Sequence, residues 1–412
     1  MEAISVPSTE DGIDPQYLIA RLKDIHKKGE PFFESYCEQN LPLAMLAVNE
    51  GGLTHAIGRI ATEWKGFIKA SAGSAEEMEA QKEVAKKVIS GEPFYIDGTS
   101  ALFLSETGTL EKIRDFLPNM KVPQSVISLL LTVTDRFRYQ HGQMGHVGYA
   151  QGQLNISDRN LTKGIQIQKN FEKSVELLEA KSQNIEAISL ANKANCFSEQ
   201  KVPASLCDAC VLAQRDQTPI LTEDFLYLQM NQLETKKEAP GYCSSLAVMR
   251  VLYEQGKIRF SEYLDYFSYL SSYRVRFLAI TTKDLETAVL GDGVLKAVQP
   301  EELRKFNFPL TLSEEYGVHR RTASAVIGPF LIKLLIDDSI IPEAVVKIFS
   351  EIITTFPASE NKRLFGENLL AVCVQVINKH SQNIILGSSV QIKIDLLSEF
   401  IRLHNAGGII LL

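Results

Sequence analysis

The chain has 412 residues, a formal net charge of −7 at pH 7, and 45% apolar residues. This apolar content is enough for packed cores and excludes a disordered chain, and the length predicts two or three domains. The acidic balance provides no overall field that attracts nucleic acid. A nucleic-acid contact would therefore need a local basic patch.

Cysteine usage and the N-terminus predict a soluble cytoplasmic protein. The six cysteines are scattered through a chain too large to need disulfides, so free thiols in a reducing compartment are the simplest interpretation. The N-terminal stretch MEAISVPSTEDGID is acidic and polar, and a signal peptide is not expected there. Since no apolar run reaches the ~18 residues typical of a membrane span, we expect no membrane association.

The first part of the chain, residues 1–92, is predicted to be a helical region. Residues 1–14 read as a disordered lead-in. Ser74 suits an N-cap, and acidic residues follow it in the first helical turn. The expected helices cover residues 16–27, 41–49, 53–68 and 74–89.

The pattern changes at Pro93, where the short β-type run PFYID begins. A helix with a break near Gly108 follows, and then a strand end leads into a long helix at VPQSV. The glycine-rich stretch HGQMGHVGYAQGQLNIS has alternating apolar residues, which predicts a hairpin or an active-site flap.

A helix over residues 162–186 and a helix and strand at about 203–222 complete this region. Alternating strands and helices predict an α/β domain over residues 93–240, with a parallel sheet covered by helices on both faces. Residues 241–412 read as almost entirely helical and show no fixed repeat, which favours an irregular helical bundle over a solenoid. These C-terminal helices are a candidate surface for a protein partner.

Three aspartates lie at positions where ligand sites occur in α/β sheets. Asp97 ends the apolar run FYID, Asp224 follows the apolar run PILT, and Asp208 is expected at the first turn of the helix between them. Ligand sites of parallel sheets lie outside the carboxyl ends of the strands. If the two strands are neighbours, the three carboxylates converge on one edge.

Three carboxylates at one place repel one another and raise one another's pKa, and a divalent cation removes that cost. A set of carboxylates, hydroxyls and waters suits Mg²⁺ or Mn²⁺, which can activate a water for attack on a phosphodiester. Thr99 and Thr222 are expected to orient the carboxylates by hydrogen bonds.

The segments FYIDGTSALFLSETGTLEKI, KVPQSVISLL and SLCDACVLAQRDQTPILTEDF resemble the PIN-domain superfamily of metal-dependent ribonucleases over roughly residues 93–230. The layout is also similar to large bacterial PIN-like proteins with helical regions on both sides. The family's motif positions correspond here to Asp97, Thr99, Ser100, Asp208, Thr222 and Asp224. The resemblance implies a Mg²⁺- or Mn²⁺-dependent endoribonuclease that acts on RNA, with the three aspartates as metal ligands and catalytic residues.

The sequence departs from the family at one position. The family has a glutamate on the second helix, and the matching place falls on Ser128 or Leu129, which carry no carboxylate. Asp135 and Glu106 are the candidates for a fourth acid. The missing glutamate supports an alternative function, in which a catalytically impaired PIN-fold protein acts as a scaffold that binds protein or RNA.

Other interpretations of the same residues stay open. Asp97 and Asp208 could each simply cap a helix. Cys207 and Cys210 form half of a zinc motif and are better explained as small apolar side chains in a helix. The basic and aromatic group RFRYQH, which begins at Arg136, could face an RNA backbone or could be a solvated helix face.

Overall fold

The computed structural model describes residues 8–9, 12–13, 20, 29–39, 41–139, 145–150, 153–158, 161–179, 185–186, 202–236, 240–276, 280–291, 299–306, 317–355, 362–380 and 388–404. No helix in these ranges is long and apolar enough to cross a membrane. The chain divides into two compact units. The first contains residues 1–258 and 272–278, and the second contains residues 259–271 and 279–412.

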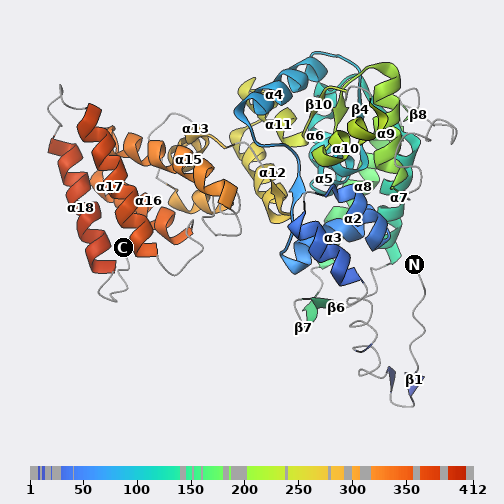
Figure 1. The fold of residues 1–412 in the computed structure, drawn as a ribbon, viewed down its shortest axis with the longest axis horizontal. Helices are drawn as coiled ribbons and strands as arrows, with labels where there is room; N and C mark the ends of the chain where they lie inside the picture. Colours follow the sequence, from blue (N-terminus) through green and yellow to red (C-terminus); the bar gives the residue numbers. More distant parts are fainter. Residues whose placement is uncertain are drawn as a thin grey trace. The chain divides into compact units, whose positions relative to one another are not determined.

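Helices dominate the N-terminal part of the first unit, as predicted. A helix over residues 29–38 precedes α2 (Leu43–Glu50), α3 (Leu53–Glu63) and α4 (Ala75–Ile89) (Figure 1). Ser74 caps α4, since its side chain accepts a hydrogen bond from the Glu77 N–H. The helix expected over 16–27 falls almost wholly outside the described residues.

The helix expected over 53–68 is shorter than predicted. It ends where Trp64 adopts a left-handed backbone conformation with φ of 53°, and the strand β3 (Ile68–Lys69) follows. This strand pairs in parallel with β11 (Val275–Arg276), from a distant part of the chain. Apolar periodicity alone did not reveal the break, because the left-handed residue is a tryptophan rather than a glycine.

A five-stranded parallel sheet forms the centre of the first unit. Its strands lie in the order β10-β9-β4-β5-β8, and every neighbouring pair is parallel. They are β4 (Phe94–Ile96), β5 (Met120–Pro123), β8 (Ile185–Glu186), β9 (Ile220–Leu221) and β10 (Tyr242–Cys243). The predicted combination of a small parallel sheet with many helices is confirmed.

The helices around this sheet largely follow the predicted order, but the helix expected over 162–186 is shorter, because Ile185 and Glu186 pair with β5 as strand β8. They are α5 (Gly98–Glu106), α6 (Thr109–Ile113), α7 (Gln124–Tyr139), α8 (Leu161–Glu179), α9 (Ala204–Asp216), α10 (Phe225–Thr235) and α11 (Ser245–Glu254). The break near Gly108 is confirmed, because this residue takes φ of 69° between α5 and α6. Helix α9 packs on β4, β5 and β9, while α4 packs beside β10 and α11 (Figure 1).

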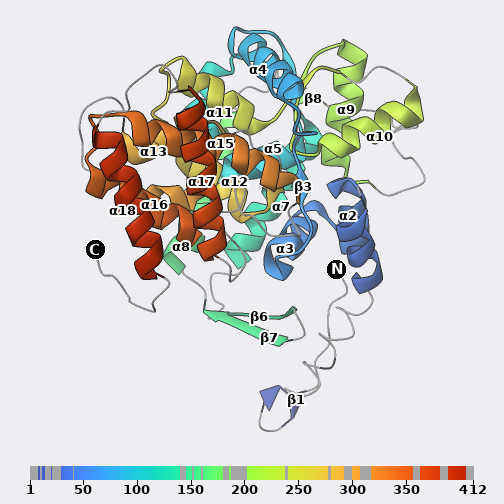
Figure 2. The ribbon, with the colours of Figure 1, turned by 60° about the vertical axis from the view of Figure 1, so that its left-hand side comes forward.

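The predicted hairpin is also present. Strands β6 (Gly145–Ala150) and β7 (Gln153–Asp158) pair antiparallel as a two-stranded sheet of their own, visible as a separate ribbon in Figure 2. The sequence signals it locally, through glycines beside a short alternating apolar pattern.

The second unit is helical, as expected for the C-terminal part. Its elements are α12 (Phe260–Ser272), α13 (Thr282–Leu290), the 3₁₀ helix η5 (Pro300–Phe306), α15 (Gly317–Ile336), α16 (Pro342–Thr355), α17 (Lys362–His380) and α18 (Ser388–His404). The two units do not coincide with the three expected regions that meet at 93 and 241. Strand β10 extends the sheet past residue 240, and α11 packs against α4.

Candidate functional site

The carboxyl ends of β4 and β9 lie side by side. Ile96 pairs with Leu221, and the Asp97 N–H continues this pairing by donating to the Leu221 carbonyl at 3.1 Å. The register therefore places Asp97 directly beside Thr222, whose hydroxyl donates to Asp97 Oδ2 at 2.5 Å. The sequence prediction that these two strand ends meet is confirmed for this pair.

Asp97 is buried, with 2% of its surface exposed, and both of its oxygens accept hydrogen bonds. Oδ1 accepts from the Thr99 hydroxyl at 2.7 Å and from the Ser100 N–H at 3.0 Å, while Oδ2 accepts from Thr222. The carboxylate thereby serves as the N-cap of α5. The roles expected for Thr99 and Thr222 as orienting groups agree with these contacts.

Asp224 is equally buried, at 1% exposure, and it joins two helices. Its Oδ1 accepts from the Tyr227 N–H at 3.3 Å, so it caps α10. Its Oδ2 accepts from the Ala44 N–H at 2.8 Å, in the first turn of α2. Because Pro42 at the start of α2 supplies no side-chain cap, Asp224 provides that cap from a distant part of the chain.

Glu223 is an acid of this cluster that the sequence did not single out. It lies fully buried between Thr222 and Asp224, at 0% exposure. Its Oε1 accepts from the Ser100 hydroxyl at 3.1 Å and from the Ser245 N–H at 2.6 Å, at the start of α11. The sequence TED could have indicated this role, because an acidic side chain directly after a buried apolar strand needs hydrogen-bond partners.

The burial of these acids changes their protonation. Loss of solvent raises the pKa of Asp97 to about 6, against the opposing effect of its three hydrogen bonds. Burial likewise raises the pKa of Glu223 to about 7 and that of Asp224 to about 7, and the negative charge of Asp97 raises both further. A substantial fraction of the cluster is therefore protonated near neutral pH.

Asp208 lies buried in the second turn of α9, the helix that packs on β4 and β9. Its neighbours Cys207 and Cys210 are buried and form no disulfide, which agrees with their expected role as small side chains in a helix. Burial raises the pKa of Cys210, and the charge of Asp97 contributes to this rise. The start of α9 is therefore close to the acid cluster, and the meeting of Asp208 with the other two aspartates stays a prediction.

The two candidates for a fourth acid have other contacts. Asp135 is exposed and pairs with Arg138 at 3.4 Å. Glu106 accepts a hydrogen bond from the Tyr273 hydroxyl at 2.7 Å. Glu223 is a further acid next to Asp97 and Asp224. It lies between Thr222 and Asp224 in the sequence, and its side chain accepts hydrogen bonds from α5 and from the start of α11.

A pocket of about 480 Å³ lies beside the cluster. Ser128 and Leu129 line it together with Ser205. Gly98, the residue after Asp97, lies so close that an added Cβ would come 2.6 Å from Ser205 Oγ and 3.0 Å from Leu129 Cδ2. A tight contact between α5, α9 and α7 therefore separates the pocket from the buried Asp97.

Asp97 and Asp224 in the acid cluster act as hydrogen-bond acceptors for the protein. Among the residues that the structure describes, no group of three or more His, Cys, Asp or Glu side chains could hold an ion. The oxygens of Asp97 and Asp224 already accept hydrogen bonds from protein donors. Mg²⁺ and Mn²⁺ bind carboxylate oxygens together with water, and the predicted use of either metal stays a prediction.

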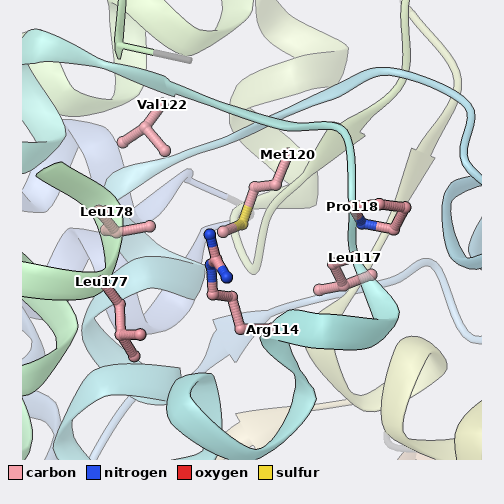
Figure 3. Close-up of a pocket in the computed structure, with 7 residues that line it drawn as sticks. All are labelled: Arg114, Leu117, Pro118, Met120, Val122, Leu177 and Leu178. Atoms are coloured by element: carbon pink, nitrogen blue, oxygen red, sulfur yellow. The ribbon is translucent and has the colours of Figure 1, made fainter. Parts of the chain in front are cut away.

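A second hollow lies near the opposite edge of the sheet, at the amino end of β5. Figure 3 shows the Arg114 and Met120 side chains facing one another in it, among leucine, proline and valine side chains. Its volume of about 10 Å³ is enough for one water at most. The larger pocket beside the acid cluster is therefore the better candidate for a ligand.

Comparison with models of known protein families, with curated proteins and with solved structures found no match for this chain.

Proposed function

We propose that the first unit is a PIN-like domain that binds RNA without hydrolysing it. The PIN resemblance is supported by the parallel order of β9, β4 and β5 and by the Thr-x-Asp motif that follows the strand next to Asp97. These features support the resemblance, because PIN motifs depend on order and on position at the strand ends.

The observation that carries the proposal is the helix-capping role of Asp97 and Asp224. Each oxygen of Asp97 and Asp224 accepts a hydrogen bond from the protein, and the acids hold the starts of α5, α10 and α2. A metal ion at these oxygens would compete with three helix caps for the same carboxylates. Breaking a cap costs about 1 kcal/mol for each helix, and buried N–H groups left without acceptors cost more.

The position of the family glutamate points the same way. Ser128 or Leu129 stands there, and the Leu129 side chain presents an apolar surface to Gly98. A hydrolytic site would need charge at this position to hold an ion or to orient a water. In this proposal the acids have a structural role, and this edge of the sheet binds RNA without hydrolysing it.

RNA is favoured as the bound partner because of the pocket beside the cluster. Arg136 lines this pocket and makes no ion pair with a carboxylate of the described residues. An unpaired arginine on a chain with a net charge of −7 is a local basic feature of the kind that RNA binding requires. A protein partner for the C-terminal helices and a cytoplasmic location stay predictions.

The experiment separates binding from hydrolysis with one labelled single-stranded RNA and the full chain. We expect binding in EDTA to equal binding in Mn²⁺, and we expect the RNA to stay intact. Asp97→Asn should bind as tightly as the wild type. RNA cleavage that requires Mn²⁺ and is lost in Asp208→Ala would replace this proposal with the predicted ribonuclease. Absence of RNA binding would refute it.

A further inference from the structure

The pocket of about 480 Å³ is formed wholly within the first unit. The start of α3 contributes residues 51–54, the start of α9 contributes residues 203–205, and one side of α7 completes the wall. The α7 residues on this wall include Ser125, Thr132 and Arg136. No Asp or Glu side chain is among the described residues that line it.

Arg136 gives the pocket a positive charge. Its Nη1 donates to the Thr54 hydroxyl at 2.9 Å, and it forms no salt bridge within the described part of the chain. Its charge also reaches His55, whose pKa is lowered first by burial and then by Arg136. Glu50 is the acid that acts on the same histidine, and Glu50 is held by Arg59 at 2.6 Å. The arginine therefore keeps an uncompensated charge.

Two helix N-termini add to this field. The caps of α3 and α9, Gly52 and Pro203, provide no side-chain hydrogen bond, and both residues line the pocket. The first N–H groups of these helices have no carbonyl partner within the helix and carry partial positive charge. Both helices are long enough, at 11 and 13 residues, for this effect to act at their ends.

A buried hydroxyl provides independent evidence for a ligand. Ser205 is 4% exposed and lies on the pocket wall, yet its hydroxyl makes no hydrogen bond with any residue that the structure describes. Its neighbour across the wall, Ser125, differs because its hydroxyl donates to the Ala204 carbonyl at 3.2 Å. The Ser205 hydroxyl therefore keeps a donor on the pocket wall for a ligand atom that accepts from it.

We propose that this pocket binds a phosphate group, held by the Arg136 guanidinium, the Ser205 hydroxyl and the N-termini of α3 and α9. An arginine fork and helix N–H groups match the oxygens of a phosphate. Gly98 and its tight contacts with Ser205 and Leu129 stand between this group and the buried acids. The proposal extends the RNA-binding function by naming the phosphate site, and the phosphate belongs either to RNA or to a free nucleotide.

The test measures binding of inorganic phosphate, adenosine monophosphate and a short oligouridylate to the full chain by calorimetry at constant ionic strength. We expect Arg136→Gln to weaken phosphate binding at least tenfold, since a hydrogen bond to a charged group is worth roughly that factor or more. Ser205→Ala should weaken it by a smaller factor. This second variant removes one oxygen and leaves every hydrogen bond of the described residues intact.

Arg138→Gln is the matched control. It removes the same charge from the same helix, but Arg138 is exposed and pairs with Asp135 and Glu172. We expect this variant to bind phosphate as the wild type does. Equal weakening by Arg136→Gln and Arg138→Gln would show a diffuse charge effect and would overturn the proposed site. Absence of phosphate binding by the wild type would overturn it as well.

The arms of the experiment also separate this proposal from the RNA-binding function. If the oligouridylate binds with equal affinity to wild type and Arg136→Gln, RNA binding stands and the phosphate site is refuted. If phosphate and the mononucleotide bind in an Arg136-dependent way and the oligouridylate does not bind, the site stands. In that case its ligand is a small phosphorylated molecule, and the RNA-binding proposal fails.

Discussion

Replacing Asp224 with alanine is expected to release the start of α2 from the sheet edge. The substitution removes the acceptor of two buried N–H groups, those of Ala44 at 2.8 Å and Tyr227 at 3.3 Å. A buried donor left without an acceptor costs ~1–3 kcal/mol. The longer bond to Tyr227 contributes less, so the expected loss is about 3 kcal/mol at mildly acidic pH.

The loss depends on pH because the pKa of Asp224 is raised to about 7 from an ordinary value of 3.8. Between these two values the native state holds a proton that the unfolded state has released. The free energy of unfolding therefore falls as pH rises through this window. Above pH 7 the buried charge itself is costly, so Asp224→Ala should be less damaging at pH 8 than at pH 5.

Hydrogen exchange followed by mass spectrometry measures this effect where it arises. A local loss of about 3 kcal/mol accelerates exchange on the order of a hundredfold, which we expect in peptides that cover α2. Peptides from α18 in the second unit should not change. The control Asp115→Ala removes an acid that is 90% exposed and lies 3.6 Å from Arg114. It should change stability by less than about 0.5 kcal/mol. Unchanged exchange in α2 of Asp224→Ala would refute the role of this carboxylate as a cap.

Three further predictions concern the same edge of the sheet. The pKa values of the buried acids Asp97, Glu223 and Asp224 are raised, so the free energy of unfolding of the full chain should fall from pH 5 to pH 8. Urea titrations at several pH values measure this fall, and Glu223→Gln should make it shallower. A slope that Glu223→Gln leaves unchanged would contradict this. Gly98→Ala should cost ~1–3 kcal/mol, since its Cβ would meet Ser205 Oγ at 2.6 Å. In the control Gly58→Ala, the added Cβ meets no atom within 4 Å, and this variant should raise stability by about 0.5–1 kcal/mol. Thermal melts in which Gly98→Ala is more stable than Gly58→Ala would disprove the tight contact at Gly98. Leu129→Glu places an acid on the pocket wall and should abolish the calorimetric phosphate signal, and an unchanged affinity would argue against a phosphate there.

Local signals in the sequence predicted much of this fold. Ser74 was recognisable as a cap because its partner, Glu77, is three residues away. The break at Gly108 and the hairpin of β6 and β7 also depend on neighbouring residues. The meeting of Asp97 with Thr222 was predictable for a more general reason, because neighbouring parallel strands end at the same edge of a sheet.

The helix expected to continue from residue 53 to 68 shows where such signals fail. Its end at Trp64 depends on a left-handed tryptophan and on the pairing of β3 with β11, which joins Ile68 to Val275. Strand β10 was missed for a related reason. Two residues, Tyr242 and Cys243, carry no periodicity, and they become a strand only because β9 lies beside them.

The sequence by itself determined the order of elements, the strand-end placement of Asp97 and Asp224, and the absence of a glutamate near Leu129. Only the tertiary structure decided what these groups do. Asp224 accepts from Ala44, 180 residues away, and burial raises its pKa to about 7. Likewise, Arg136 is recognisable as a charge in the sequence, but its lack of an acidic partner depends on which distant side chains surround it. A carboxylate oxygen can cap whichever helix start lies beside it, and the fold determines which N–H groups come within its reach.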